Sequence, residues 1–166
     1  VEQRSGRTPP LMLAPARALA LGLPLALMAG ALGSQYLGGL APCEMCMWQR
    51  WPHYAAIAVA ILAILLRRSS ASLWLTVLAG LLILTSGALG IFHAGVEYSW
   101  WTGPQHCTGI VSGGGADLLR QIMAAPIVRC DVPQWTLFGV SLAGWNGLFS
   151  LAGGIAVLAL CTKVRR

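Results

Sequence analysis

The feature that most constrains the fold of this chain is the placement of its charged residues. Four long stretches contain no Asp, Glu, Lys or Arg, namely 18–43, 51–66, 69–96 and 132–162. A helix needs roughly 20 apolar residues to cross a hydrocarbon core of about 30 Å, so the first, third and fourth stretches are long enough. The second becomes long enough if its helix begins near Met47, which leaves Arg50 at the membrane interface. The sequence therefore predicts four membrane-spanning helices.

The predicted fold class is an all-α membrane protein, with residues 1–166 forming one integral domain. We expect the spans near 18–40, 48–66, 72–97 and 134–161. The external segments between them are expected near 41–47 and 98–133. The second external segment contains ADLLRQIMAA (116–125), which favours a short amphipathic helix on the membrane surface. A cleaved signal peptide is the alternative for the first stretch, but an apolar core of about 7–15 residues is usual there and this one is longer.

Composition agrees with a membrane protein and excludes several other classes. The chain is 57% hydrophobic and 10% charged, whereas soluble domains are about 25% charged. So few charged residues cannot cover the surface of a water-soluble globule of this length. A soluble enzyme, a disordered tail and a nucleic-acid-binding module are therefore poor interpretations, despite a net charge of +6.

The basic residues predict the orientation of the helices. Eight of the eleven lie before the first span, between the second and third, or after the fourth: Arg4, Arg7, Arg17, Arg67, Arg68, Lys163, Arg165 and Arg166. Cytoplasmic loops of membrane proteins carry an excess of Lys and Arg. We therefore expect both termini in the cytoplasm and no nucleic-acid partner.

Five cysteines are the candidate chemical groups of the chain. In this topology, Cys43 and Cys46 lie in the first external segment, and Cys107 and Cys130 lie in the second. The outside of a bacterial inner membrane is oxidising, so external pairs can form disulfides. Cys161 lies at the cytoplasmic end of the last span, and we expect it to act as a small apolar residue.

The Cys43-Glu44-Met45-Cys46 motif has three interpretations: a zinc half-site, a redox disulfide or chance. Zinc requires four ligands, and His106 is the only other soft ligand near Cys107. A helix N-terminus and a nearby cation both favour a thiolate. Arg50 follows Cys46 by one helical turn and can face the same side, although Glu44 is expected to oppose thiolate formation. These features favour a redox site over a metal site.

His93 and Glu97 are the ionisable residues at the outer end of the third span. They are four residues apart and share a helix face. Ionisable groups in membrane helices are by default candidates for function, and the alternative is a pair that only orients the helix. Glycines on the third and first spans are expected to allow close helix packing: Gly80, Gly87, Gly90, Gly30 and Gly33.

Several sequence segments together resemble the disulfide bond formation protein B (DsbB) family, the quinone reductases of the bacterial inner membrane. They are P-C-E-M-C-M-W-Q-R (Pro42 to Arg50), H-A-G-V-E-Y-S-W-W (His93 to Trp101), Cys107, and C-D-V-P-Q-W (Cys130 to Trp135). The similarity runs from the first span to the fourth. It implies a thiol:quinone oxidoreductase embedded in membrane lipid, with its active cysteines on the periplasmic side.

The resemblance also implies a role for each candidate residue. A reduced DsbA-like thiol oxidase, a soluble periplasmic protein of the thioredoxin fold, would attack a Cys107–Cys130 disulfide. Cys130 would then exchange with a Cys43–Cys46 disulfide and leave Cys46 as a thiolate facing a bound quinone, either ubiquinone or menaquinone. By the same resemblance Arg50 would contact that thiolate and the quinone, and His93 and Glu97 are further candidate contacts.

Three other functions are compatible with the sequence. The chain can be a dedicated paralogue that serves one partner. It can be an enzyme similar to vitamin K epoxide reductase, although in that family the CxxC motif comes late in the chain. It can also be a structural four-helix membrane protein with static disulfides, which would not exchange with a reduced partner.

Overall fold

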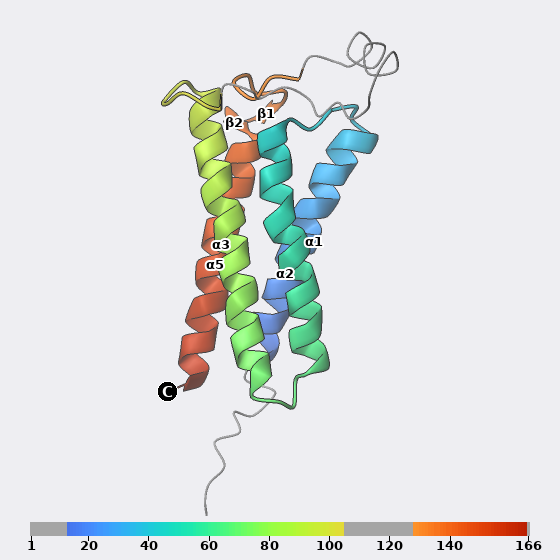
Figure 1. Cartoon of the computed structure of the whole chain (residues 1–166), viewed down its shortest axis with the longest axis vertical. Coiled ribbons are helices and arrows are strands. Elements are labelled where there is room, and N and C mark those ends of the chain that lie inside the picture. Colours follow the sequence, from blue (N-terminus) through green and yellow to red (C-terminus); the bar gives the residue numbers. More distant parts are fainter. Residues whose placement is uncertain (1–12, 105–127, 166) are drawn as a thin grey trace, which may run out of the picture.

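Four long helices form an upright bundle in the computed structural model, which describes residues 13–104 and 128–165. In chain order the helices are α1 (Ala14–Tyr36), α2 (Glu44–Leu65), α3 (Ala71–Glu97) and α5 (Leu142–Arg165). Figure 1 shows them running alongside one another, with a small β-hairpin at one end. The predicted helical bundle is therefore confirmed for this part of the chain. The predicted helix at 116–125 lies outside the described residues.

Three of the described helices are long and apolar enough to cross a membrane. They are α1, α3 and the Leu142–Lys163 part of α5. The remaining helix, α2, has 22 residues but carries Glu44, Gln49, Arg50 and His53 in its first half. These polar side chains lower its hydropathy, and Gln49, Arg50 and His53 are all buried in the bundle.

The last helix begins at Leu142, later than the predicted span of 134–161. Residues 136–141 form an antiparallel hairpin instead, with β1 (Thr136–Leu137) paired to β2 (Val140–Ser141). Its two turn residues, Phe138 and Gly139, have φ values of 52° and 77°. Positive φ at both central residues is the mark of a type I′ hairpin turn, which a continuing helix cannot accommodate.

α3 and α5 pack closely against each other, where glycines allow the two backbones to meet. A Cβ atom at Gly90 would lie 2.8 Å from the backbone nitrogen of Gly147, and one at Gly87 would lie 2.9 Å from that of Leu151. The predicted close packing is therefore confirmed on α3. It is wrong for Gly30 and Gly33 on α1, because no atom lies within 4 Å of a Cβ built at either position.

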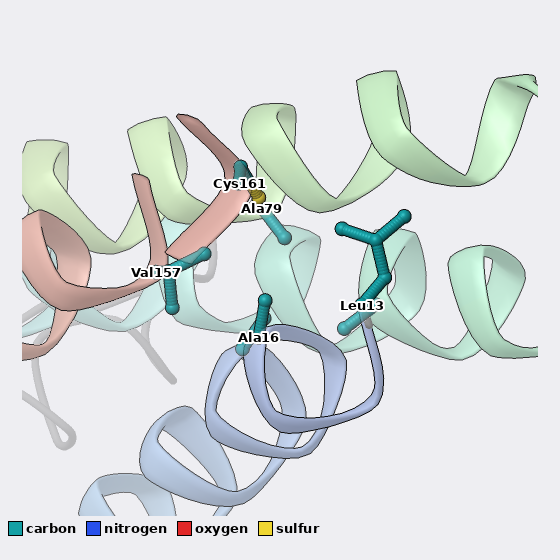
Figure 2. Close-up of a cluster of buried hydrophobic side chains, with 7 residues drawn as sticks. Leu13, Ala16, Ala79, Val157 and Cys161 are labelled. Atoms are coloured by element: carbon teal, nitrogen blue, oxygen red, sulfur yellow. The ribbon is translucent and has the colours of Figure 1, made fainter. Parts of the chain in front are cut away.

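Small side chains fill the core at the end of the bundle opposite the hairpin. Figure 2 shows this cluster. Leu13, the N-cap residue of α1, and Ala16 of α1 pack with Ala79, Val157 and Cys161. Cys161 is a free thiol that is 2% exposed, so it packs as the predicted small apolar residue. The start of α1, the α2–α3 connection and the end of α5 all lie at this end (Figure 1).

Candidate functional site

Cys43 and Cys46 lie at the N-terminus of α2. Cys43 has an extended backbone conformation and caps the helix, because its sulfur accepts a hydrogen bond from the backbone N–H of Cys46 at 3.2 Å. Its thiol also donates to the Cys46 sulfur at 3.0 Å. Both cysteines are free thiols in this structure. The motif therefore places two sulfur atoms within contact distance at the positive end of a helix.

The two thiols differ in acidity. Cys43 and Cys46 both come before the membrane span predicted at 48–66. The hydrogen bond donated by the Cys43 thiol lowers the pKa of Cys46, and the positive charge of Arg50 acts in the same direction. The same hydrogen bond, together with burial, raises the pKa of Cys43. Glu97, rather than Glu44, is the carboxylate that opposes the charge on Cys46. Cys46 is therefore the thiol of this pair that more readily becomes a thiolate.

Cys130 lies directly against this pair. Its sulfur, the Cys43 sulfur and one ring nitrogen of His93 all lie within 4.8 Å of one another, and all three residues are buried. The segment is held there by Gln134, whose amide donates to the backbone oxygen of Ala41 at 2.8 Å. Cys130 is disulfide-bonded. The structure thus brings together cysteines from both predicted external segments.

Cys107, the predicted disulfide partner of Cys130, lies outside the described residues, so this pairing stays a prediction. Cys43, His93 and Cys130 are also close enough to surround a metal ion. A sulfur atom in a disulfide is not a thiolate ligand, however, and thiolate is the form in which cysteine binds zinc. The described arrangement therefore suits sulfur exchange better than metal binding.

His93 and Glu97 lie on α3 beside Cys43. The His93 ring nitrogen Nε2 is 3.6 Å from the Cys43 sulfur and 3.8 Å from Glu97 Oε1. Its other nitrogen, Nδ1, is 2.8 Å from the side-chain nitrogen of Gln49. That amide nitrogen is a donor, so Nδ1 accepts and neutral His93 carries its proton on Nε2. The proton of His93 therefore faces Cys43, Glu97 and the backbone of Cys130, with which His93 has a hydrogen bond.

An outer cavity lies beside the cysteine pair. Among its lining residues are Cys43, Cys46, Arg50, His93, Glu97 and Gln134. The predicted residues from α2 and α3 therefore share one cavity with the segment that follows Cys130.

An inner cavity lies between α1, α2 and α5. Apolar side chains form much of its wall, including Trp145 and Phe149, whose rings stack with centroids 5.5 Å apart. Cys46 and Arg50 line this cavity as well as the outer one. Arg50 is held in place by α1, since its guanidinium donates to Gln35 Oε1 and to the backbone oxygen of Ala31. Of the two cavities, His93 and Glu97 line only the outer one. Their predicted contact with a cofactor stays a prediction.

A buried polar network beside the inner cavity was not anticipated. The Asn146 side-chain nitrogen donates to Gln49 Oε1 at 2.9 Å, and the Asn146 oxygen lies 2.9 Å from His53 Nε2. All three residues line the inner cavity. In the sequence, His53 could have indicated this network, because it is an ionisable residue inside a predicted span. Asn146 carries no charge and had no such signal.

Several known proteins are similar to this chain over most of its length. The family described as "Disulfide bond formation protein DsbB" matches residues 14–160. The chain is 33% identical over 150 residues to "Disulfide bond formation protein B" of Verminephrobacter eiseniae (strain EF01-2), covering 84% of this chain and 80% of that protein. It is 32% identical over 170 residues to the protein of the same name from Polaromonas naphthalenivorans (strain CJ2), covering 94% and 96% respectively. No solved structure matches the chain at a significant level.

Proposed function

This chain belongs to the disulfide bond formation protein B family, and on that premise we propose that it is a thiol:quinone oxidoreductase of the bacterial inner membrane. Its substrate is a reduced periplasmic dithiol protein of the DsbA type, and its electron acceptor is a membrane quinone. One observation carries the proposal: Cys46 and Arg50 line both the outer and the inner cavity. A sulfur that exchanges in one cavity can therefore react in the other without moving between sites.

The first described step is exchange between Cys130 and the Cys43–Cys46 disulfide. The partner attacks a Cys107–Cys130 disulfide and releases Cys130 as a thiolate. That thiolate attacks the Cys43 sulfur, a Cys43–Cys130 bond forms, and the Cys43–Cys46 bond breaks with its electron pair on Cys46. The sulfur atoms of Cys130 and Cys43 lie within 4.8 Å of each other, which supports this step. The lowered pKa of Cys46 makes it the better leaving group.

The residues of the inner cavity fit a quinone. A quinone has a flat ring with two polar oxygens and an apolar tail. The stacked rings of Trp145 and Phe149 and the apolar wall suit the ring and tail, while Arg50 offers a buried cation, 8% exposed, beside Cys46. A bound quinone supplies an acceptor of two electrons and two protons. In the whole reaction, the partner dithiol becomes a disulfide and the quinone becomes a quinol.

His93 has a role toward Cys43 in this scheme. Its Nε2–H lies 3.6 Å from the Cys43 sulfur and can donate to that sulfur when it carries negative charge. Such a donor stabilises Cys43 whenever it carries negative charge as a thiolate. Glu97 lies 3.8 Å from the same nitrogen and keeps the ring oriented. Both residues act on sulfur exchange in this proposal rather than on the quinone.

The proposal includes four membrane crossings, with α2 as the fourth and both termini in the cytoplasm. Two observations support it. Gln49, Arg50 and His53 of α2 are buried in the bundle rather than facing lipid. The basic residues Arg67, Arg68 and Lys163 lie at the end of the bundle opposite the cysteines, as Figure 1 shows for their segments, which is the arrangement that the positive-inside rule expects.

The test is quinone reduction by the purified protein in detergent. A reduced DsbA-like protein is the electron donor, and short-chain ubiquinone and menaquinone analogues are compared as acceptors by their absorbance. We expect turnover with the wild type, loss of turnover in Cys46→Ala, and retention in Cys161→Ala, which removes a buried thiol far from the relay. Full turnover in Cys46→Ala would contradict the mechanism. A panel of reduced partners distinguishes a general oxidase from a dedicated one.

A second measurement tests the exchange step by itself. When Cys46 is replaced by alanine, Cys43 has no partner in its own motif. Its thiolate can then attack the Cys130 sulfur of the Cys107–Cys130 disulfide, which forms a Cys43–Cys130 bond and releases Cys107 as a thiolate. Mass spectrometry of proteolytic fragments should then detect a Cys43–Cys130 bond. Detection of only a Cys130 disulfide that is inert to the reduced partner would favour a structural role for the disulfides.

A further inference from the structure

His53 contains a buried polar atom without a partner. The side chain is 2% exposed and lines the inner cavity. Its Nδ1 atom has no hydrogen-bond partner among the described residues. A buried nitrogen without a hydrogen bond is destabilising, and such a group in a native fold calls for a ligand or a water.

The polar network fixes which hydrogen bond Nδ1 can make. Asn146 donates its amide N–H to Gln49 Oε1, so its oxygen is the atom that faces His53 Nε2 at 2.9 Å. The Asn146 oxygen is an acceptor, and the proton of neutral His53 therefore lies on Nε2. Nδ1 carries the lone pair and accepts. The missing partner of His53 must be a hydrogen-bond donor.

This requirement distinguishes the two redox forms of a quinone. The oxidised form has carbonyl oxygens, which only accept. In the reaction proposed above, Cys43 and Cys46 lose two electrons and two protons and form a disulfide, and the electrons and protons become the two hydroxyl groups of the quinol. A quinol hydroxyl is the donor that Nδ1 lacks.

We infer that His53 is a binding residue of the inner cavity that selects the reduced form of the ligand, by accepting a hydrogen bond from a quinol hydroxyl at Nδ1. The inference rests on the proposed function, because it names a contact in the same cavity. Arg50 and His53 are three residues apart on α2 and line the same cavity. They provide a donor and an acceptor to one ring, and only the acceptor depends on the redox state of that ring.

The test compares binding of the two redox forms. Calorimetry at fixed detergent concentration measures the dissociation constants of a decyl-chain benzoquinone and of its quinol, in a Cys46→Ala background that cannot pass electrons to the ligand. One neutral hydrogen bond corresponds to about a 2- to 12-fold change in affinity. We expect His53→Leu to weaken quinol binding by that factor and to leave quinone binding unchanged. Thr76→Val is the control, since Thr76 is also buried in the bundle but does not line the cavity, and it should change neither affinity.

Two outcomes of this binding experiment would overturn the inference. Equal losses for quinone and quinol in His53→Leu would overturn the inference while leaving the proposed function intact. Binding of neither form before His53 is changed would overturn the proposed function and the inference with it. A second measurement does not depend on a variant: ¹⁵N NMR of histidine-labelled protein should find His53 protonated at Nε2, and protonation at Nδ1 would overturn the inference.

Discussion

The contact between α3 and α5 gives the sharpest prediction for stability, because it is made by backbone atoms. A Cβ atom at Gly90 would lie 2.8 Å from the nitrogen of Gly147, 2.9 Å from the oxygen of Ala143 and 3.0 Å from the Cα of Gly147. Carbon atoms in good contact are about 3.5–4.0 Å apart. No side-chain rotation relieves these contacts, so in Gly90→Ala the two helices must separate by roughly 0.5–1 Å, the difference between these distances.

The expected cost follows from two opposing effects. Forcing an extra methyl group into a packed contact costs about 1–3 kcal/mol, while replacing Gly by Ala inside a helix contributes about 0.5–1 kcal/mol of stability. Gly22→Ala on α1 isolates the second effect, because no atom lies within 4 Å of a Cβ built there. The two variants should therefore differ in their free energy of unfolding by about 1–3 kcal/mol, which is the packing effect alone.

Unfolding in mixed micelles, with rising SDS and helicity followed by circular dichroism, measures this difference. Gly90→Ala should unfold at lower SDS than the wild type, and Gly22→Ala at equal or higher SDS. The reasoning would be refuted if both variants were equally stable. The position also has a functional readout. Ala143 and Asn146 on α5 line the inner cavity, so a displaced α5 should reduce quinone affinity in Gly90→Ala but not in Gly22→Ala.

Three further predictions concern the site and its orientation. Gly30 lines the inner cavity with open space beside its Cα, so a leucine side chain there would fill part of the cavity. Gly30→Leu should therefore raise the KM for quinone several-fold, whereas Gly22→Leu on the same helix should not. Equal KM values in the two variants would argue that quinone does not bind in this cavity. The pKa of Cys46 is lowered by the Cys43 thiol and by Arg50, so in the reduced protein Cys46 should be alkylated by iodoacetamide at lower pH than Cys43. Arg50→Met should raise that pKa and shift the alkylation of Cys46 to higher pH, as measured by mass spectrometry, and an unshifted profile would remove Arg50 from the account. A reporter fused in the α2–α3 connection should be cytoplasmic and one inserted in the β-hairpin should be periplasmic; both on the same side would contradict four crossings.

Much of the fold could be read from the sequence because the cost of placing charge in a hydrocarbon core is local to each residue. The charge-free stretches contain most of α1, α3 and α5. The start of α5 was missed for an equally local reason. The turn that delays it uses Phe138 and Gly139 at positive φ, and a Phe-Gly pair is not among the Asn-Gly and Asp-Gly pairs that identify such turns.

One part of the candidate site could also be predicted from the sequence, and another part could not. The CxxC motif and Arg50 lie within eight consecutive residues, and helix geometry alone places them together. Cys130 and His93 come from other segments, and their approach to Cys43 depends on contacts such as the one between Gln134 and Ala41. Sequence spacing contains no information about contacts of this kind.

The sequence by itself determined the helices, the end of the bundle that carries the cysteines, and the residue types available for redox chemistry. These follow from hydrophobicity, charge and short-range spacing, each of which is a property of a few adjacent residues. Only the tertiary structure decided that two cavities meet at Cys46 and Arg50, and that His53 keeps a free acceptor. Both depend on side chains such as Asn146, 93 positions from His53, which become neighbours only when α2, α3 and α5 pack together.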